Sequence, residues 1–216
     1  MHKKNFFFIV FEGIEGSGKS YQSQRLYKNI KSKKFPAILT REPGGTIGAE
    51  RIRNIILKDY FHPDTKEKFH KYTDTLLYLA ARNEHVQNKI KKAIEKKKIV
   101  ICDRFIDSTL AYQVYGKGVE KKLIDSVHKI ILKNIKPDIT FVLKVSLSKA
   151  FKRLKKRKKK NRYDKFSKSF YSKAQRAFIR IAKKNRKKYY ILDNSNDDKG
   201  LEKVILNIVL SKLKRL

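Results

Sequence analysis

The chain has 216 residues, and its 55 lysines and arginines against 20 acidic residues give a formal charge of +35. This length corresponds most simply to one domain, residues 1–216, with a substantial core. No apolar run approaches the length of a membrane helix, and the single cysteine, Cys102, excludes an internal disulfide framework. Reduced cysteine is typical of the cytosol, so we expect a cytoplasmic protein with no membrane partner.

The positive charge suggests at first sight that the chain binds nucleic acid. However, lysine outnumbers arginine 42 to 13, and the lysines are spread over the whole chain. A dedicated nucleic-acid face would concentrate its charge. We therefore favour compositional drift at permissive surface positions, and we expect no dedicated nucleic-acid partner.

The most informative stretch is residues 6–21. Residues 6–11 form an apolar run of the length of a buried strand, and the next residues match the phosphate-loop pattern G-x-x-x-x-G-K-[ST]. Glycines let backbone N–H groups wrap around phosphate, while Lys19 reaches the β- and γ-phosphates and Ser20 ligates Mg²⁺. The pattern therefore predicts a site for a nucleoside triphosphate and magnesium. The residues expected to form it are Gly13, Ile14, Glu15, Gly16, Ser17, Gly18, Lys19 and Ser20.

Hydrophobic periodicity predicts alternating strands and helices along the rest of the chain. The further strands are expected at residues 35–39, 99–105, 137–143 and 189–193. The helices are expected at residues 19–33, 47–57, 67–97, 120–134, 166–184 and 201–213. We find no internal repeat and no linker.

Polar residues follow two of these strands. Asp103 and Arg104 end the strand at residues 99–105, and an aspartate there can supply a second carboxylate near Mg²⁺. An arginine after it, instead of a water-activating glutamate, can clamp the phosphate of a second substrate. Residues 40–46, TREPGGT, are either a plain turn with a surface ion pair or part of a ligand site.

The densest basic run covers residues 150–164. It is either solvated surface, or a nucleic-acid patch, or a lid whose arginines close over the triphosphate. An arginine finger is worth on the order of 10³ to 10⁵ in rate, and a lid excludes water from the reaction.

Five segments in this order resemble the thymidylate kinase family over nearly the whole chain. They are the phosphate loop with Glu15 inside it, residues 40–46, the Ala80-Ala81-Arg82 segment, residues 103–113 and residues 137–143. The resemblance implies an α/β P-loop NTPase fold, with a five-stranded parallel sheet flanked by helices on both faces. It also implies a homodimer that transfers the γ-phosphoryl group of ATP to dTMP with Mg²⁺.

On the ATP side, the resemblance assigns the phosphates to Lys19 and the loop amides, and the metal to Ser20 and Asp103. Arg157 is expected at the transferring phosphoryl group, with Arg153 and Arg162 assisting. The expected catalytic set is Lys19, Glu42, Asp103, Arg104 and Arg157.

On the dTMP side, the resemblance implies that Arg53 and Arg104 bind the phosphate, and that Glu42 and Asp103 organise the acceptor and its magnesium water. Glu15 is expected to face the 3′-hydroxyl of the sugar. The residues expected around the base and sugar are Tyr78 stacked on thymine, Arg82 at its edge, Thr109 and Gln113 at the base, and Tyr112 under the sugar.

Two alternatives remain at this point. The first is another deoxynucleoside monophosphate kinase, against which Arg82 and Gln113 favour thymine. The second is a P-loop ATPase that binds nucleic acid, against which the Asp103-Arg104 pair argues.

Overall fold

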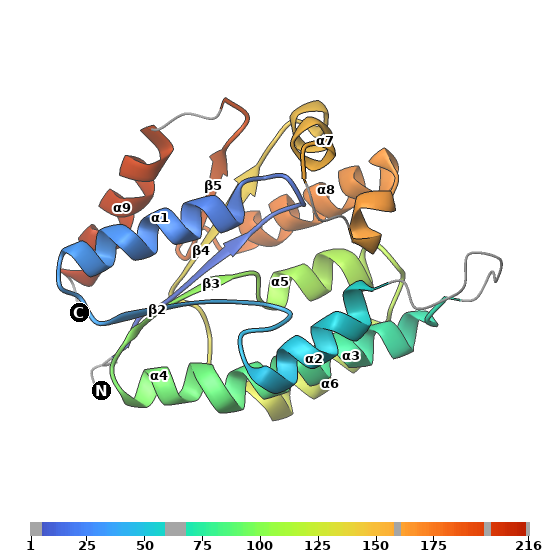
Figure 1. Cartoon of the computed structure of the whole chain (residues 1–216), viewed down its shortest axis with the longest axis horizontal. Helices are drawn as coiled ribbons and strands as arrows, with labels where there is room; N and C mark the ends of the chain where they lie inside the picture. The colour runs from blue at the N-terminus through green and yellow to red at the C-terminus, as the bar shows by residue number, and fades with distance from the viewer. Residues whose placement is uncertain (1–5, 59–67, 158–160, 197–199, 215–216) are drawn as a thin grey trace.

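In the computed structural model, which describes residues 6–58, 68–157, 161–196 and 200–214, the core is one parallel sheet of five strands in the order β2-β3-β1-β4-β5 (Figure 1). The strands are β1 (Phe8–Glu12), β2 (Ala37–Arg41), β3 (Ile99–Asp103), β4 (Ile139–Lys144) and β5 (Tyr189–Asp193). The sheet confirms the predicted α/β fold class and its five parallel strands.

Helices cover both faces of the sheet. Their bounds are α1 Lys19–Ser32, α2 Ile47–Leu57, α3 Lys71–His85, α4 Lys91–Glu95, α5 Ile106–Thr109, α6 Lys121–Leu132, α7 Leu147–Lys155, α8 Lys168–Lys184 and α9 Gly200–Leu213. Two π-helical turns, Val86–Ile90 and Leu110–Val114, and a 3₁₀ turn, Arg162–Lys165, complete the regular structure of the described residues. None of the described helices combines the length and apolar character that a membrane span requires.

The alternation of side chains along β1 explains the two layers. Ile9 and Phe11 pack against α1 and α9 on one face, while Phe8 and Val10 pack against α3, α4 and α6 on the other (Figure 1). All five β1 residues are buried, as expected for the central strand of a parallel sheet. The helix α8 extends the second layer beside β4 and β5.

Several element boundaries differ from the sequence-based expectation, and two of these differences are structurally informative. The second strand begins at Ala37 and extends through Arg41, because Thr40 and Arg41 pair with Cys102 and Asp103 of β3. The helix expected at residues 67–97 begins at Lys71 and is interrupted by the π turn Val86–Ile90 before α4.

The carboxyl ends of the strands meet at one edge, where ligands bind in open α/β sheets. The phosphate loop leaves β1 at this edge, between the neighbouring strands β3 and β4. The helix α7 and the 3₁₀ turn Arg162–Lys165 belong to the segment predicted as a lid, residues 150–164; residues 158–160 of that prediction lie outside the described part of the chain.

Candidate active site

The phosphate loop depends on glycines at points of close approach. Gly16 and Gly18 adopt positive φ angles of 74° and 88°. A Cβ on Gly16 would lie 2.6 Å from the carbonyl oxygen of Ala150, and one on Gly18 would lie 2.2 Å from the Asn194 amide nitrogen. Glycine is therefore required at both positions for steric as well as conformational reasons.

The side chain of Lys19 folds back onto the phosphate loop. Its Nζ donates to the carbonyl oxygen of Ile14 at 2.7 Å and lies 3.4 Å from Ser17 Oγ. Burial, and next the positive charge of Arg104, lower the pKa of Lys19 to about 8. An incoming polyphosphate would supply the counter-charges that this buried ammonium otherwise finds only at a distance.

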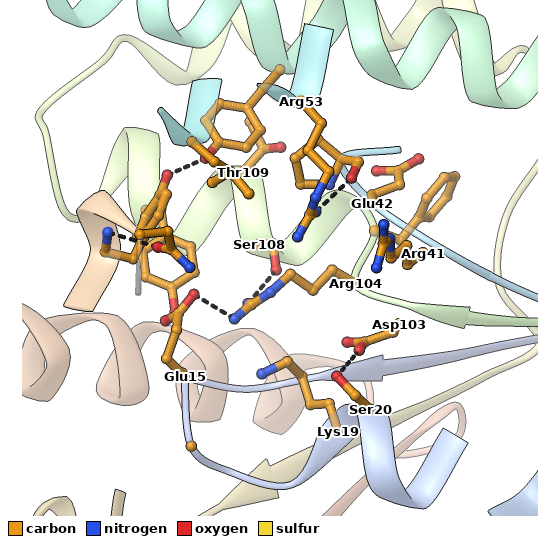
Figure 2. A pocket seen from close by; sticks show the side chains of 18 of the residues that line it. Glu15, Lys19, Ser20, Arg41, Glu42, Arg53, Asp103, Arg104, Ser108 and Thr109 are labelled. Atoms are coloured by element: carbon orange, nitrogen blue, oxygen red, sulfur yellow. Dashed lines mark hydrogen bonds and ion pairs between the residues drawn. The ribbon is translucent and has the colours of Figure 1, made fainter. Parts of the chain in front are cut away.

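Ser20 and Asp103, the two residues predicted to hold the metal, are in direct contact. The Ser20 hydroxyl donates to Asp103 Oδ2, which joins the start of α1 to the end of β3 (Figure 2). Asp103 Oδ1 is buried and has no hydrogen-bond partner among the described residues. Mg²⁺ at nucleotide sites is typically held by one or two carboxylates together with substrate phosphates and water. A hydroxyl beside a carboxylate with one unpartnered oxygen fits that requirement.

The described residues contain no cluster of three or more His, Cys, Asp or Glu side chains that would hold a metal by itself. One hydroxyl and one carboxylate, as in the pair Ser20–Asp103, suit a metal that arrives with a phosphate ligand.

Arg104 projects from a left-handed residue at the end of β3, with φ of 74°. Its guanidinium donates to Ser108 Oγ at 3.0 Å and to Glu15 Oε1 at 2.7 Å (Figure 2). It also donates to the Gly13 carbonyl oxygen at 2.9 Å. Burial opposes its charge, but the anionic neighbour Glu15 outweighs this and the pKa of Arg104 stays well above its usual value. A permanent cation therefore lies between the phosphate loop and α5.

Glu15 connects this cation to Tyr112. The Tyr112 hydroxyl donates to Glu15 Oε2 at 2.5 Å, and the Arg104 guanidinium lies 5.3 Å from the centre of the Tyr112 ring. Burial raises the pKa of Glu15, but the charges of Arg104 and Lys19 outweigh burial, so the net shift is downward. The expected sugar-facing carboxylate is thus ionised and held in place.

Glu12 is a site-supporting residue that sequence reasoning missed. It is fully buried at the end of β1, and its carboxylate accepts from the Phe105 N–H at 2.8 Å and from the Ser108 hydroxyl at 2.6 Å. These bonds fix the turn that aims Arg104 into the site. In the sequence Glu12 directly follows an apolar run, and nothing there distinguishes it from an ordinary acidic residue at the end of a strand.

Arg82, on α3, is only 3% exposed. Its guanidinium nitrogens make five contacts with acceptor atoms. The acceptors are Glu42 Oε2, contacted by Nε and Nη2 at 2.7 Å, Thr109 Oγ1 at 2.8 Å, His128 Nε2 at 2.7 Å and the Phe105 carbonyl oxygen at 2.8 Å. The guanidinium has five N–H donors. The structure therefore places Arg82 at the cavity wall with its donors already engaged, and its contact with a base stays a prediction.

Two histidines complete this buried network and were missed from the sequence. His85 Nδ1 lies 3.0 Å from Glu42 Oε1, and its Nε2 lies 2.7 Å from Thr40 Oγ1. Burial and the nearby Arg82 charge lower the pKa of His128 to about 3, so His128 is neutral and accepts from Arg82. Burial raises the pKa of Glu42, but Arg82 and His85 outweigh it and the net shift is downward.

The remaining residues predicted on the acceptor side also reach the cavity. Arg53 donates to the Pro43 carbonyl oxygen at 2.6 Å, and burial followed by the Arg41 charge lowers its pKa. Gln113 is buried, lines the cavity, and its Nε2 has no hydrogen-bond partner among the described residues. Such an orphaned amide donor is typical of a position that a ligand satisfies.

Tyr78 lies on α3 opposite a residue of the predicted lid. Its hydroxyl is hydrogen-bonded to that of Tyr163, and the Tyr163 ring packs edge-on against Tyr112 with 5.6 Å between centroids. Both Tyr78 and Tyr163 line the cavity. Tyr163 was not predicted, because nothing in a basic run identifies one tyrosine as a wall residue.

The structure separates the three arginines predicted on the ATP side. Arg157 lines the cavity just beyond α7. Arg153 also lines it, but its guanidinium donates to the carbonyl oxygens of Gly16 at 2.8 Å and Asn194 at 2.7 Å, which fastens α7 to the phosphate loop. Arg162 is absent from the lining of this cavity and forms an ion pair with the buried Asp74.

The cavity that the lining residues share has a volume of about 360 Å³ and lies at the carboxyl edge of the sheet. The phosphate loop, the strand-end pair Asp103-Arg104 and α3 contribute to its wall, so cations approach it from two sides. A glycine loop after the central strand, with a strand-end carboxylate bonded to its serine, defines the protein as a P-loop NTPase fold with a second polar site facing the loop.

The thymidylate kinase family model matches residues 11–205. A thymidylate kinase of Mycoplasma capricolum is 40% identical over 210 residues, covering 96% of each chain, and one from the Wolbachia of Brugia malayi is 45% identical over 179 residues, covering 81% of this chain and 80% of its own. The crystal structure of thymidylate kinase from Ehrlichia chaffeensis superposes with a TM-score of 0.72 at 33% identity, covering 94% of this chain and 98% of the other. The chain belongs to the thymidylate kinase family.

Proposed function

We propose that this protein transfers the γ-phosphoryl group of ATP to dTMP and so forms dTDP and ADP. The observation that carries the proposal is that the phosphate-loop cation Lys19 and the strand-end cation Arg104 line the same cavity. Two anionic phosphates must approach in line for transfer. A site with cations supplied separately from the loop and from β3 provides a place for each.

The chain's residues act mainly by position and charge. Lys19 and the loop N–H groups hold the phosphates of ATP, and Arg104 and Arg53 hold the phosphate of dTMP. Arg157 supplies positive charge where the equatorial oxygens of the transferred group become more negative. Little covalent chemistry is needed, so the proposed mechanism has no covalent enzyme intermediate.

Ser20 and Asp103 are the residues that we propose hold Mg²⁺. When bound, the ion would neutralise charge on the phosphates as they meet. The unpartnered Asp103 Oδ1 and its Ser20-bonded Oδ2 support this assignment. Glu42 and Asp103 are the proposed organisers of the acceptor side.

The acceptor is proposed to be selected by shape and hydrogen bonding. Tyr78 stacks on the base, while Gln113 and Thr109 meet its polar edge, with Arg82 beside them. Tyr112 lies under the sugar, where its ring would crowd a ribose 2′-hydroxyl. Glu15 accepts from the 3′-hydroxyl.

The experiment is ADP release from ATP and Mg²⁺ with dTMP, ribo-TMP, dUMP, dCMP, dGMP or dAMP added one at a time. We expect strong turnover with dTMP, weaker turnover with dUMP and near-background turnover with the others. Arms with added single-stranded DNA or RNA and no monophosphate test the ATPase alternative. Turnover without a monophosphate, or a larger signal with another base, would refute the proposal.

We also propose a homodimer in the cytoplasm. Large apolar side chains are exposed on three helices that cover one side of the sheet: Ile47 on α2 is 79% exposed, Leu76 on α3 is 51% and Ile130 on α6 is 73% (Figure 1). Exposed apolar side chains on neighbouring helices support an association surface. Cys102, the single cysteine, is buried and unpaired, as suits a reducing compartment.

A further inference from the structure

Asp74 is a buried carboxylate that the reaction described above does not use. It lies on α3 with no exposed surface, and it receives cations from two other parts of the chain. Lys117 Nζ lies 2.7 Å from Asp74 Oδ2, and the Arg162 guanidinium pairs with Asp74 Oδ1. Both partners are mostly buried, with 22% and 18% of their side chains exposed.

The three charged groups come from three segments that border the acceptor end of the cavity. Asp74 lies one helical turn before Tyr78 on α3. Lys117 follows the π turn Leu110–Val114, which carries Tyr112 and Gln113. Arg162 begins the 3₁₀ turn Arg162–Lys165 of the predicted lid. Asp74 therefore joins the base-binding helix to the sugar-binding turn and to the lid.

We call the ion pairs of Asp74 with Lys117 and Arg162 the junction. Tyr163, the residue after Arg162, shows which part of the site the junction holds in place. Tyr163 lines the cavity, its hydroxyl pairs with that of Tyr78, and its ring packs on Tyr112. Its carbonyl oxygen accepts from the Tyr171 hydroxyl at 2.7 Å, and the Arg162 guanidinium lies 5.5 Å from the centre of its ring. The lid segment thus contributes one wall of the site proposed for dTMP.

We infer that Asp74 is a positioning residue for acceptor binding, and that Arg162 acts as its lid partner rather than as a ligand of the triphosphate. A buried carboxylate flanked by two cations is stable only when all three segments are docked, since any unpaired member would be a buried charge. The junction therefore selects the arrangement in which Tyr163 and Tyr112 close the wall beside Tyr78. This inference rests on the proposed function.

Arg162→Gln separates this role from the one predicted from the sequence. If Arg162 acts through Asp74, the Arg162→Gln variant is expected to have a KM for dTMP about tenfold higher than the wild type. Its KM for ATP is expected to stay within about twofold of the wild-type value. Asp74→Asn changes the same parameter in the same direction. The double variant is no worse than Asp74→Asn alone, because residues that act through one contact are not additive.

The matched control is Asp125→Asn, which removes an aspartate from an exposed pair with Lys121 on α6. It is expected to leave both KM values unchanged. Melting temperatures of all variants accompany the kinetics. If Asp74→Asn does not fold, Arg162→Gln alone decides, because its aspartate partner keeps Lys117.

Three results would overturn the inference. The first is a higher KM for ATP or a lower kcat in Arg162→Gln with an unchanged KM for dTMP. This result would show that Arg162 acts on the triphosphate, as predicted from the sequence. The second is a lower melting temperature with both KM values unchanged, which would make the junction only structural. The third is additive effects in the double variant.

Calorimetric titration of the wild type with dTMP distinguishes failure of this inference from failure of the proposed function. A wild type that neither binds nor turns over dTMP refutes the proposed function itself.

Discussion

At the scale of single residues, Lys19 combines the position proposed for phosphate binding with an unusual titration. Burial and the Arg104 charge lower its pKa to about 8, so the neutral form begins to accumulate within an experimentally accessible range. A lysine with a lowered pKa is charged below that pKa and loses its charge as the pH rises through it. Affinity for ATP depends on the charged form.

We therefore expect ATP binding, measured by calorimetry without dTMP, to weaken above about pH 8. The titration alone lowers the affinity about tenfold between pH 7 and pH 9. Lys19→Met is the control, since it should bind weakly at every pH and lack this loss. A wild-type affinity that stays constant to pH 9 would show that Lys19 remains charged in the free protein.

The residue scale also shows where sequence reasoning ends. Lys19, Ser20, Asp103 and Arg104 could be predicted because they occupy fixed places relative to a motif or a strand end, and the structure brings all four to one cavity. His85, His128 and Asp74 could not, because their partners lie 43, 46 and 88 residues away in the chain. Arg162 was assigned by its place in a basic run, whereas its partner is set by tertiary packing.

At the scale of elements, α7 connects the lid to the phosphate loop. Its N-cap Ser146 accepts from the Lys149 N–H, and Arg153 fastens the helix to Gly16. Arg157 follows the C-terminus of α7 and lines the cavity. The anchored helix supports the role proposed for Arg157, which is to act on the transferred phosphoryl group and not on the acceptor.

For Arg157→Ala we expect kcat to fall by about 10² or more, while the Kd for dTMP stays nearly unchanged. Steady-state kinetics and calorimetry measure the two quantities. Lys152→Ala, a solvent-exposed change on the same helix, is the matched control and should retain wild-type kcat. An Arg157→Ala enzyme with unchanged kcat would remove Arg157 from the proposed mechanism.

Most elements could be predicted from hydrophobic periodicity, and the fifth strand, Tyr189–Asp193, lies at the predicted residues. The exceptions have tertiary causes. The second strand is extended by pairing with β3. The sequence of the π turn Val86–Ile90 has no hydrophobic pattern that distinguishes it from an α-helix. A period of 3.6 continues through such a turn with only a local shift.

At the scale of the whole molecule, the exposed apolar residues of α2, α3 and α6 bear on assembly. We expect light scattering to give a mass of twice the 25.5 kDa chain. Leu76→Glu should shift the protein toward the monomer, because burying an unpaired carboxylate in an interface is costly. Val204→Glu on α9, 46% exposed, lies on the opposite face of the sheet and should leave the mass unchanged.

A monomeric wild type would refute the homodimer, and a dimeric Leu76→Glu protein would place its interface away from α3. The charge of +35 makes the ionic strength part of this measurement, since self-repulsion between like-charged copies is screened by salt. Measurements at about 0.15 M salt and above keep that repulsion from masking association.

The central place of β1 in the sheet has a consequence for synthesis on the ribosome. β1 pairs with β3 and β4, and roughly 130 residues separate its end from the end of β4. At about 5–20 residues per second, its second neighbour emerges roughly 7 to 26 seconds later.

During that interval the nascent chain carries residues 6–11, FFFIVF, without the strands that will bury them. Such an uncharged, proline-free run of high β-propensity pairs readily with copies of itself. His2, Lys3 and Lys4 precede it, and charges beside a sticky segment oppose that pairing. We therefore expect Lys3 and Lys4 to oppose such pairing until the rest of the sheet has been made.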